Sequence, residues 1–174
     1  RTHRSAKPTE DCMFIDPLKE GVLKLHNVCS WGGKENNKGA IISAYNLTNT
    51  KQKASFKVDD IPDIEHADRY WIYDYMNKKV QSLGKKDAFE SEIESNGYGW
   101  YIILPETNDI TCFGLINKYV CLKAVESIVN SPNTQVVVLH ETGIVGWASK
   151  KSIKRVTING IDKTKDVKEN GEFH

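Results

Sequence analysis

The stretch RYWIYDYMNKKVQSL, Arg69–Leu83, decides the fold class. Its first part, Arg69–Met76, is rich in aromatic residues, which favour β-strands. A second strand-like run, Lys78–Leu83, follows it, and the polar pair Asn77–Lys78 separates the two. Two such runs around a short polar turn predict a β-hairpin.

Strand-like runs recur on both sides of this hairpin, while no window longer than about a dozen residues has the apolar period of a helix. The turn signals between the runs come about every 8–12 residues, as they do in β-sandwiches. The sequence therefore predicts an all-β protein, an antiparallel β-sandwich of short strands with few or no helices. The other expected strands are 22–28, 39–47, 54–61, 88–94, 100–106, 109–120, 124–130, 134–141, 143–149 and 153–160.

The side-chain pattern predicts the surroundings of some of these runs. The three glutamates of Ala88–Glu94 share one strand face, which we expect to face water. Gly114 is expected at a bulge or at a close approach of two backbones. The run TQVVVLHE, Thr134–Glu141, is almost continuously apolar, which is typical of a central strand covered on both faces.

Composition excludes several classes of partner. The chain of 174 residues favours one domain, and its 24 basic and 23 acidic residues give a net charge of +1. The chain therefore lacks the large excess of positive charge that would attract nucleic acid or an anionic membrane. The basic cluster at 150–155 has no aromatic stacking platform beside it, so we interpret it as a solvated surface. The longest apolar runs, such as Tyr101–Leu104, are far too short to span a membrane.

The cysteines and histidines indicate neither a metal nor a cofactor. Cys12, Cys29, Cys112 and Cys121 form no C-x-x-C pair, and we expect buried, reduced thiols. No two histidines are three or four residues apart, so a helical metal pair is absent. The reduced cysteines and the lack of an apolar leader favour the cytoplasm. The sequon NLT, Asn46–Thr48, is interpreted as incidental.

No catalytic residue can be assigned from the sequence, since it contains no nucleophile elbow, phosphate-binding loop or dinucleotide fingerprint. Asp11 and Asp16 bracket the residues CMFI and could approach one another. Carboxylates in turn segments of this kind usually accept backbone N–H groups. We therefore expect both aspartates to be structural.

Aromatic residues supply the candidate ligand site. Trp71, Tyr73 and Tyr75 lie on one face of a single strand, where they could stack on a sugar ring, although large rings on one strand face more often belong to a core. Trp31 lies in the glycine-rich loop CSWGGKENNKG and is expected to be exposed for a ligand or interdomain contact. The alternative for Trp31 is a loop anchor packed on the edge of the sandwich.

Three stretches resemble the raffinose synthase-like branch of the family 36 glycoside hydrolases, and a fourth resembles glycosidase β-domains in general. KPTEDCMFIDPLKEGVLKLHNV, Lys7–Val28, resembles the segment where the catalytic (β/α)₈ barrel of that family ends and a C-terminal β-domain begins. GAIISAYNL, Gly39–Leu47, resembles the strand that follows in that family, and RYWIYDYMNKKV, Arg69–Val80, looks like the hairpin of glycosidase C-terminal sandwiches in general. IVGWASKKSIKRVTINGIDKT, Ile144–Thr164, is similar to the closing element of the family, whereas residues 51–133 match only as a generic sandwich.

The resemblance implies that residues 1–20 are a junction segment after a catalytic barrel that this sequence lacks. Residues 21–174 would then be a C-terminal β-sandwich domain, truncated at its end. Asp11 and Asp16 match positions at the junction, while the aspartate nucleophile and acid/base of the family would lie on the barrel. The implied function is an accessory domain of an α-galactosidase-like glycosidase, which stabilises the barrel and is not catalytic alone.

Two other functions stay open. A carbohydrate-binding module would grip galactosides itself, through Trp31 or through the face formed by Trp71, Tyr73 and Tyr75. A plain interaction domain with no connection to sugars is also compatible with the strand pattern.

Overall fold

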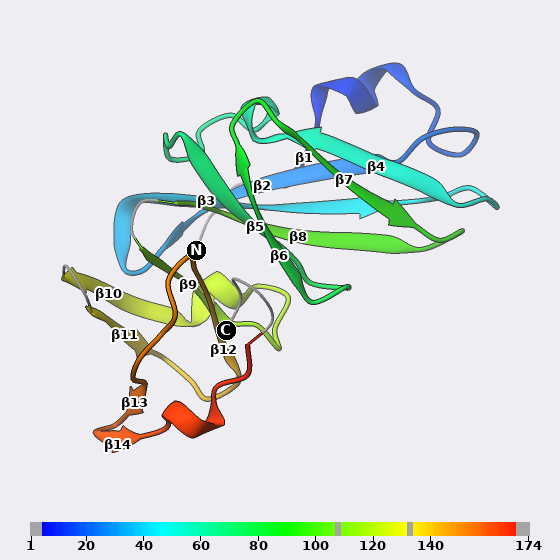
Figure 1. The fold of residues 1–174 in the computed structure, drawn as a ribbon. Helices are drawn as coiled ribbons and strands as arrows, with labels where there is room; N and C mark the ends of the chain where they lie inside the picture. The colour runs from blue at the N-terminus through cyan, green and yellow to red at the C-terminus, as the bar shows by residue number, and fades with distance from the viewer. Residues whose placement is uncertain (1–4, 107–108, 132–133, 170–174) are drawn as a thin grey trace.

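Six antiparallel strands form the central sheet of the computed structural model, which describes residues 5–106, 109–131 and 134–169 (Figure 1). Their order across the sheet is β1-β2-β3-β8-β5-β6. Their bounds are β1 Lys7–Pro8, β2 Leu23–Trp31, β3 Lys34–Tyr45, β5 Arg69–Asp74, β6 Lys79–Gly84 and β8 Tyr98–Pro105. The other strands are β4 Gln52–Lys57, β7 Ala88–Ile93, β9 Ile110–Leu115, β10 Val125–Ser131, β11 Thr134–Leu139, β12 Val145–Ser149, β13 Thr157–Ile158 and β14 Ile161–Asp162.

The described helical turns are short 3₁₀ turns, so the all-β prediction is confirmed. These turns are η1 Glu10–Phe14, η2 Val58–Asp60, η3 Cys121–Ala124 and η4 Thr164–Asp166. Within the described ranges, no helix has the length and apolar character that crossing a membrane requires.

The predicted hairpin is present as β5 and β6. Its turn covers Tyr75–Lys78 rather than Asn77–Lys78 alone. The Asp74 carboxylate explains the wider turn, because its Oδ1 accepts the backbone N–H groups of Met76 and Asn77 at 3.1 and 3.0 Å. Two donors that have no strand partner are thereby satisfied.

One face of the central sheet packs against the β4–β7 ribbon, which lies above it in Figure 1. Phe56 and Phe89 pair across this ribbon, and their ring centroids lie 5.5 and 5.0 Å from that of Tyr101 on β8. The three glutamates of Ala88–Glu94 are exposed on the outer side, as expected. The buried residues of this layer are Val22, Ala40, Ile42, Ala44, Ala54, Phe56, Val58, Ile61, Tyr70, Ile72, Phe89, Ile93, Tyr101 and Ile103.

The other face packs against the pairs β9–β12 and β10–β11 and against η3, which lie below the sheet in Figure 1. The expected sandwich therefore has three layers, with the central sheet covered on both sides. The buried residues of this second layer are Cys29, Trp31, Ile41, Trp71, Tyr73, Ile102, Leu104, Cys112, Phe113, Cys121, Leu122, Val125, Ile128 and Ala148.

The β11 strand corrects one expectation. The run Thr134–Glu141 is not a central strand, because β11 pairs with β10 in a two-stranded sheet. Val136 and Val138 on its outer face are 55% and 44% exposed, while Val137 and Leu139 pack on the core. β-Branched residues favour a strand on either face, so the apolar run does not reveal how many faces are covered.

Two further predictions concern the C-terminal part. The expected strand 153–160 is mostly irregular, with Thr157–Ile158 paired to β14. The bulge expected at Gly114 is confirmed, since its φ is 83° and the β9–β12 register shifts beside it. A Cβ at Gly114 would lie 2.3 Å from the carbonyl oxygen of Cys121, so no larger residue fits without a shift.

Candidate functional site

Trp71 and Tyr73 lie in the core rather than on a surface. Their exposed fractions are 1% and 0%, and both pack in the layer between the central sheet and β9–β12. Burial raises the pKa of Tyr73 well above its usual range. The ammonium of Lys150 lies 5.8 Å from the ring centroid of Trp71. These two rings therefore fill the interior, which is the alternative that the strand pattern favoured.

The exposure expected for Trp31 is wrong. The side chain is 5% exposed and belongs to the same core. Trp31 is the last residue of β2, and Gly32 and Gly33, with φ of 64° and 73°, make the turn to β3. The tight turn leaves Trp31 in the strand, so its ring follows the strand face into the core. The alternative, a loop anchor on the edge of the sandwich, is correct in that the ring is packed, but Trp31 is a strand residue in the core rather than a loop residue at the edge.

Tyr75 lies in the turn after β5, half-buried against this core, with its ring centroid 6.3 Å from that of Tyr73. It also belongs to a group of rings that we call the tyrosine cluster: Tyr75, Tyr98, Trp100 and Tyr119. The ring centroids of Tyr75 and Tyr119 are 4.7 Å apart, and those of Trp100 and Tyr119 are 5.5 Å apart at 79°. Tyr98 and Tyr119 are 41% and 45% exposed. The cluster therefore presents ring surface to solvent.

Hydrogen bonds fix the tyrosine cluster in place. The Trp100 Nε1–H donates to the carbonyl oxygen of Tyr119 at 2.7 Å. The hydroxyl oxygens of Tyr98 and Tyr119 are 2.8 Å apart and share one hydrogen bond. The Tyr75 hydroxyl lies 3.4 Å from the carbonyl oxygen of Asn117. The segment that follows β9 is thus held against the start of β8.

Sequence reasoning found Tyr75 but missed the other members of the tyrosine cluster. Tyr98 and Trp100 are two residues apart in the strand NGYGWY, which places them on one face. This signal was present in the sequence. Tyr119 reaches them from another part of the chain, and its contact depends on the packing of β9 against the sheet, which no local pattern records.

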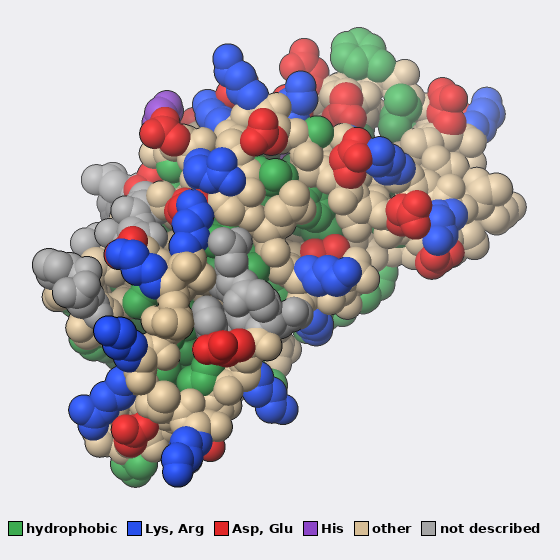
Figure 2. Space-filling model, viewed as in Figure 1, with side chains coloured by type: hydrophobic (Ala, Val, Ile, Leu, Met, Phe, Trp, Pro, Cys, Tyr) green, Lys and Arg blue, Asp and Glu red, His purple; other side chains and the backbone are tan. Residues whose placement is uncertain are grey.

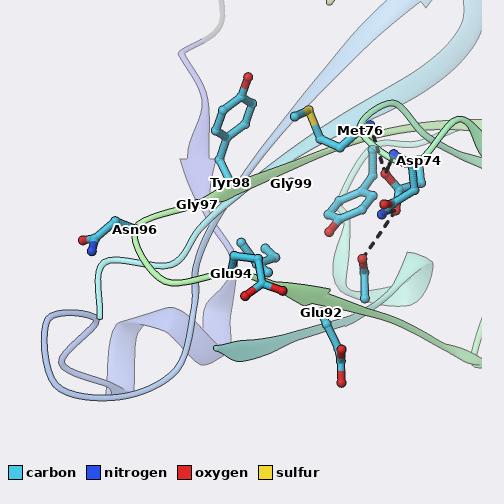
Figure 3. A pocket seen from close by; sticks show the side chains of 12 residues that line it. Asp74, Met76, Glu92, Glu94, Asn96, Gly97, Tyr98 and Gly99 are labelled. Carbon is cyan, nitrogen blue, oxygen red and sulfur yellow. Dashed lines mark hydrogen bonds between the residues drawn. The ribbon is translucent and has the colours of Figure 1, made fainter. Parts of the chain in front are cut away.

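A hollow of about 330 Å³ lies beside β8, between β7 and the turn that follows β5 (Figure 3). The carboxylate of Asp74 borders it, but its Oδ2 accepts hydrogen bonds from Asn77 Nδ2 at 2.8 Å and Ser91 Oγ at 3.4 Å. Its other oxygen caps the turn. Glu92 points away from Asp74 in Figure 3. Glu92 and Glu94, which also border the hollow, form ion pairs with Lys51 at 3.3 and 2.9 Å, so all three carboxylates have partners within the fold.

Asp11 and Asp16 make separate contacts. The Asp16 Oδ1 accepts the backbone N–H of Leu18 at 3.1 Å, which is the structural role expected. Asp11 departs from the expectation, since it accepts the Thr9 hydroxyl at 2.6 Å and forms an ion pair with Lys24. A buried lysine on β2, rather than backbone, is therefore the partner of Asp11.

Thr9, Asp11, Cys12 and Lys24 form what we call the N-terminal clamp. The Lys24 side chain is 7% exposed, and its Nζ also donates to the carbonyl oxygen of Ser55 on β4 at 2.6 Å. The Cys12 Sγ accepts the Lys24 backbone N–H at 3.2 Å. Burial alone would raise the pKa of Asp11, but hydrogen bonds from Lys24 and Thr9 outweigh it and lower the pKa. The clamp fastens η1 to β2 and β4.

The segment beyond the clamp exposes apolar side chains. Met13, Phe14 and Leu18 are 68%, 82% and 70% exposed. In Figure 2, hydrophobic side chains stand out at the upper edge, where η1 projects from the fold in Figure 1. Several large apolar side chains exposed to this degree within one short segment are unusual for a protein surface. We call these three residues the apolar ridge.

The cysteines match the sequence prediction. All four are free and buried. Burial raises the pKa of Cys112 to about 11 and that of Cys121 to about 12, so both stay protonated at neutral pH. Among the described side chains, no three of His, Cys, Asp and Glu are placed to hold a metal ion.

The sequon and the basic cluster have structural explanations. Asn46 is 0% exposed, and its amide is enclosed by backbone carbonyls of the β7–β8 turn. In the cluster at 150–155, Lys150, Lys151 and Arg155 form ion pairs with Glu106, Asp109 and Asp162, respectively. The cluster is thus a solvated, neutralised surface, as interpreted from the sequence.

No family model matches the chain. Curated proteins and solved structures that are similar to it include the following two. The chain is 27% identical over 120 residues to a galactinol–sucrose galactosyltransferase of Oryza sativa subsp. japonica. That match covers 60% of this chain but 15% of the rice protein, so the chain spans a small part of its relative. A solved structure of a candidate α-N-acetylgalactosaminidase from Bacillus halodurans C-125 has a TM-score of 0.42 and 14% identity over 58% of this chain and 21% of that one.

Proposed function

We propose that this chain is an accessory β-domain of a glycoside hydrolase-related enzyme of the raffinose synthase-like branch of family 36. Its role is to stabilise a catalytic (β/α)₈ barrel carried elsewhere in the parent protein. The observation that carries the proposal is the sequence similarity to a galactinol–sucrose galactosyltransferase, of which it matches a small part. Residues 1–20 are then the junction and residues 21–174 the accessory domain.

The site geometry is compatible with a domain that is not catalytic alone. Asp74 caps a turn, Asp11 pairs with Lys24, and Asp16 caps a turn in the N-terminal segment. Each of these carboxylates serves the fold. The bond-breaking carboxylates of the proposed enzyme would therefore lie on the barrel.

The apolar ridge supports a docking role. The N-terminal clamp holds η1 rigidly, so Met13 and Phe14 are presented on an ordered surface rather than on a flexible linker. Each large apolar side chain contributes about 1.5–3 kcal/mol when it is fully buried. Burial of the ridge against the barrel would stabilise both parts, as interdomain contacts do.

The test replaces the apolar ridge in the parent enzyme with Met13→Ser, Phe14→Ser and Leu18→Ser. The matched control is Ile158→Ser with Ile161→Ser, whose side chains are 53% and 64% exposed on the distant β13–β14 hairpin. The ridge variant should inactivate at lower temperature than the wild type, and the control should not.

The same variants in the isolated chain separate docking from folding. Because the ridge residues are exposed there, the unfolding midpoint of the isolated chain should change little in either variant. Equal inactivation temperatures for the ridge variant and the wild-type parent would contradict the docking role.

A further inference from the structure

The tyrosine cluster is not needed for the accessory role proposed above. We propose that it is a binding site for a neutral saccharide, with Tyr98 and Tyr119 as the contacting rings. The site lies at the start of β8, where Tyr98 also borders the hollow that Asp74 lines. It differs from the ligand site expected from the sequence, the face of Trp71, Tyr73 and Tyr75, because Trp71 and Tyr73 are buried.

Exposure distinguishes these rings from the core aromatics. Tyr98 and Tyr119 are 41% and 45% exposed, compared with 1% for Trp71 and 0% for Tyr73. A tyrosine ring combines an apolar face with a polar edge. The C–H face of a pyranose matches the ring face, and its hydroxyls match the phenolic group.

The cluster is organised before any ligand arrives. Trp100 anchors the Tyr119 backbone through its indole N–H, and Tyr75 lies against the Tyr119 ring at 4.7 Å. The Lys78 ammonium lies 3.5 Å from the centroid of the Tyr75 ring. Rings held in this way lose little rotamer freedom on binding, which lowers the cost of capturing a weakly binding ligand.

The hydroxyl pair supplies hydrogen-bonding capacity. A tyrosine hydroxyl has one hydrogen to donate and lone pairs to accept with. Tyr98 and Tyr119 share a single hydrogen bond with oxygens 2.8 Å apart. That bond uses one hydrogen, so the pair keeps a second hydrogen and acceptor lone pairs for the vicinal hydroxyls of a sugar. This combination of donor and acceptor groups matches the hydroxyls of a neutral saccharide, which also both donate and accept.

The experiment titrates raffinose into the isotopically labelled chain and follows the Trp100 indole N–H by NMR. This proton is bonded to the Tyr119 carbonyl, so a ligand on the cluster perturbs it directly. We expect saturable shifts with a Kd on the order of 1 mM, typical of a small interface with few contacts. Absence of saturable shifts at the Trp100 indole and at residues 96–100 with every sugar tested would overturn the proposal.

Matched variants localise the site. Tyr119→Ala should weaken binding about tenfold, equivalent to one good ring contact. Tyr98→Phe keeps the ring and removes one hydroxyl of the pair, so it should weaken binding less than Tyr119→Ala does. Because this change is small, it also tests the site if Tyr119→Ala fails to fold. Phe14→Ala removes an exposed aromatic ring elsewhere and should leave the Kd unchanged. Equal affinity of wild type, Tyr119→Ala and Tyr98→Phe would contradict the assignment.

The choice of a galactose-containing probe rests on the proposed function, so maltose is titrated in parallel. Binding of maltose but not raffinose at the tyrosine cluster would keep the saccharide site and count against the galactosidase relationship. Burial of Tyr119 in the parent enzyme, detected as loss of the raffinose response there, would show a protein contact instead and overturn the proposal.

Discussion

Asn46 gives the sharpest test of the packing at the end of the sheet. Its amide Nδ2 lies 2.8, 3.0 and 2.9 Å from the carbonyl oxygens of Thr50, Ile93 and Glu94, which share its two hydrogens. Its Oδ1 accepts the backbone N–H of Thr48 at 3.0 Å. The side chain therefore ties the β3–β4 loop to the β7–β8 turn from a fully buried position.

Asn46→Ala removes these bonds without offering replacements. The Thr50 and Glu94 carbonyls keep other partners, from the Thr48 hydroxyl and the Gly97 N–H. The buried Thr48 N–H loses its partner, which costs about 1–3 kcal/mol, and the Ile93 carbonyl loses one hydrogen bond, which is worth about 0.5–1.5 kcal/mol. The variant should thus lose about 3 kcal/mol of unfolding free energy, which lowers Tm by about 10 °C for a chain of this length.

The measurement is thermal and urea unfolding of the isolated chain followed by circular dichroism. The matched control is Asn49→Ala, three residues along in the same loop, where the side chain is exposed and the midpoint should change little. A Tm for Asn46→Ala within about 2 °C of the wild type would refute the reasoning, because such a shift corresponds to less than 1 kcal/mol.

Three further predictions follow from single residues. Gly99→Ala should unfold at lower temperature in a melting experiment, since a Cβ there would lie 2.2 Å from the Tyr101 hydroxyl oxygen. Cys112 and Cys121, with pKa values raised to about 11 and about 12, should not react with a thiol reagent at pH 8 until the chain unfolds; rapid reaction in buffer would contradict their burial. The folded-state pKa of Asp11 lies below 3.8, so its stabilising contribution is complete above pH 3.8 and is lost as pH falls through the folded-state value. Asp11→Asn should therefore be less stable than the wild type at pH 7, and the unfolding free energies from urea titrations should converge only as pH falls from 3.8 through the lower folded-state pKa.

The sequence predicted the elements whose signals are local. The hairpin of β5 and β6 follows from the aromatic run and the polar turn in Arg69–Leu83, and the bulge follows from Gly114. Both depend on backbone preferences that individual residues carry. The exposure of the glutamates in Ala88–Glu94 was also predicted correctly, because side chains two residues apart in a strand lie on the same face.

Tertiary features could not be predicted in this way. Trp31 is buried because the glycine turn after it keeps it in β2, and the loop composition alone favoured exposure. The open face of β11 depends on which strands pack nearby rather than on its own residues. Tyr119 joins Tyr98 from a distant part of the chain, so the tyrosine cluster exists only in the folded protein.

The central claim is that this chain stabilises a catalytic region carried elsewhere in its parent protein. The most direct measurement is the half-life of α-galactoside turnover at elevated temperature for the parent with and without residues 5–169. Removal should shorten the half-life by about tenfold or more, since each 1.4 kcal/mol of lost interdomain stabilisation changes a rate tenfold. Equal half-lives, or α-galactoside turnover by the isolated chain, would contradict the account.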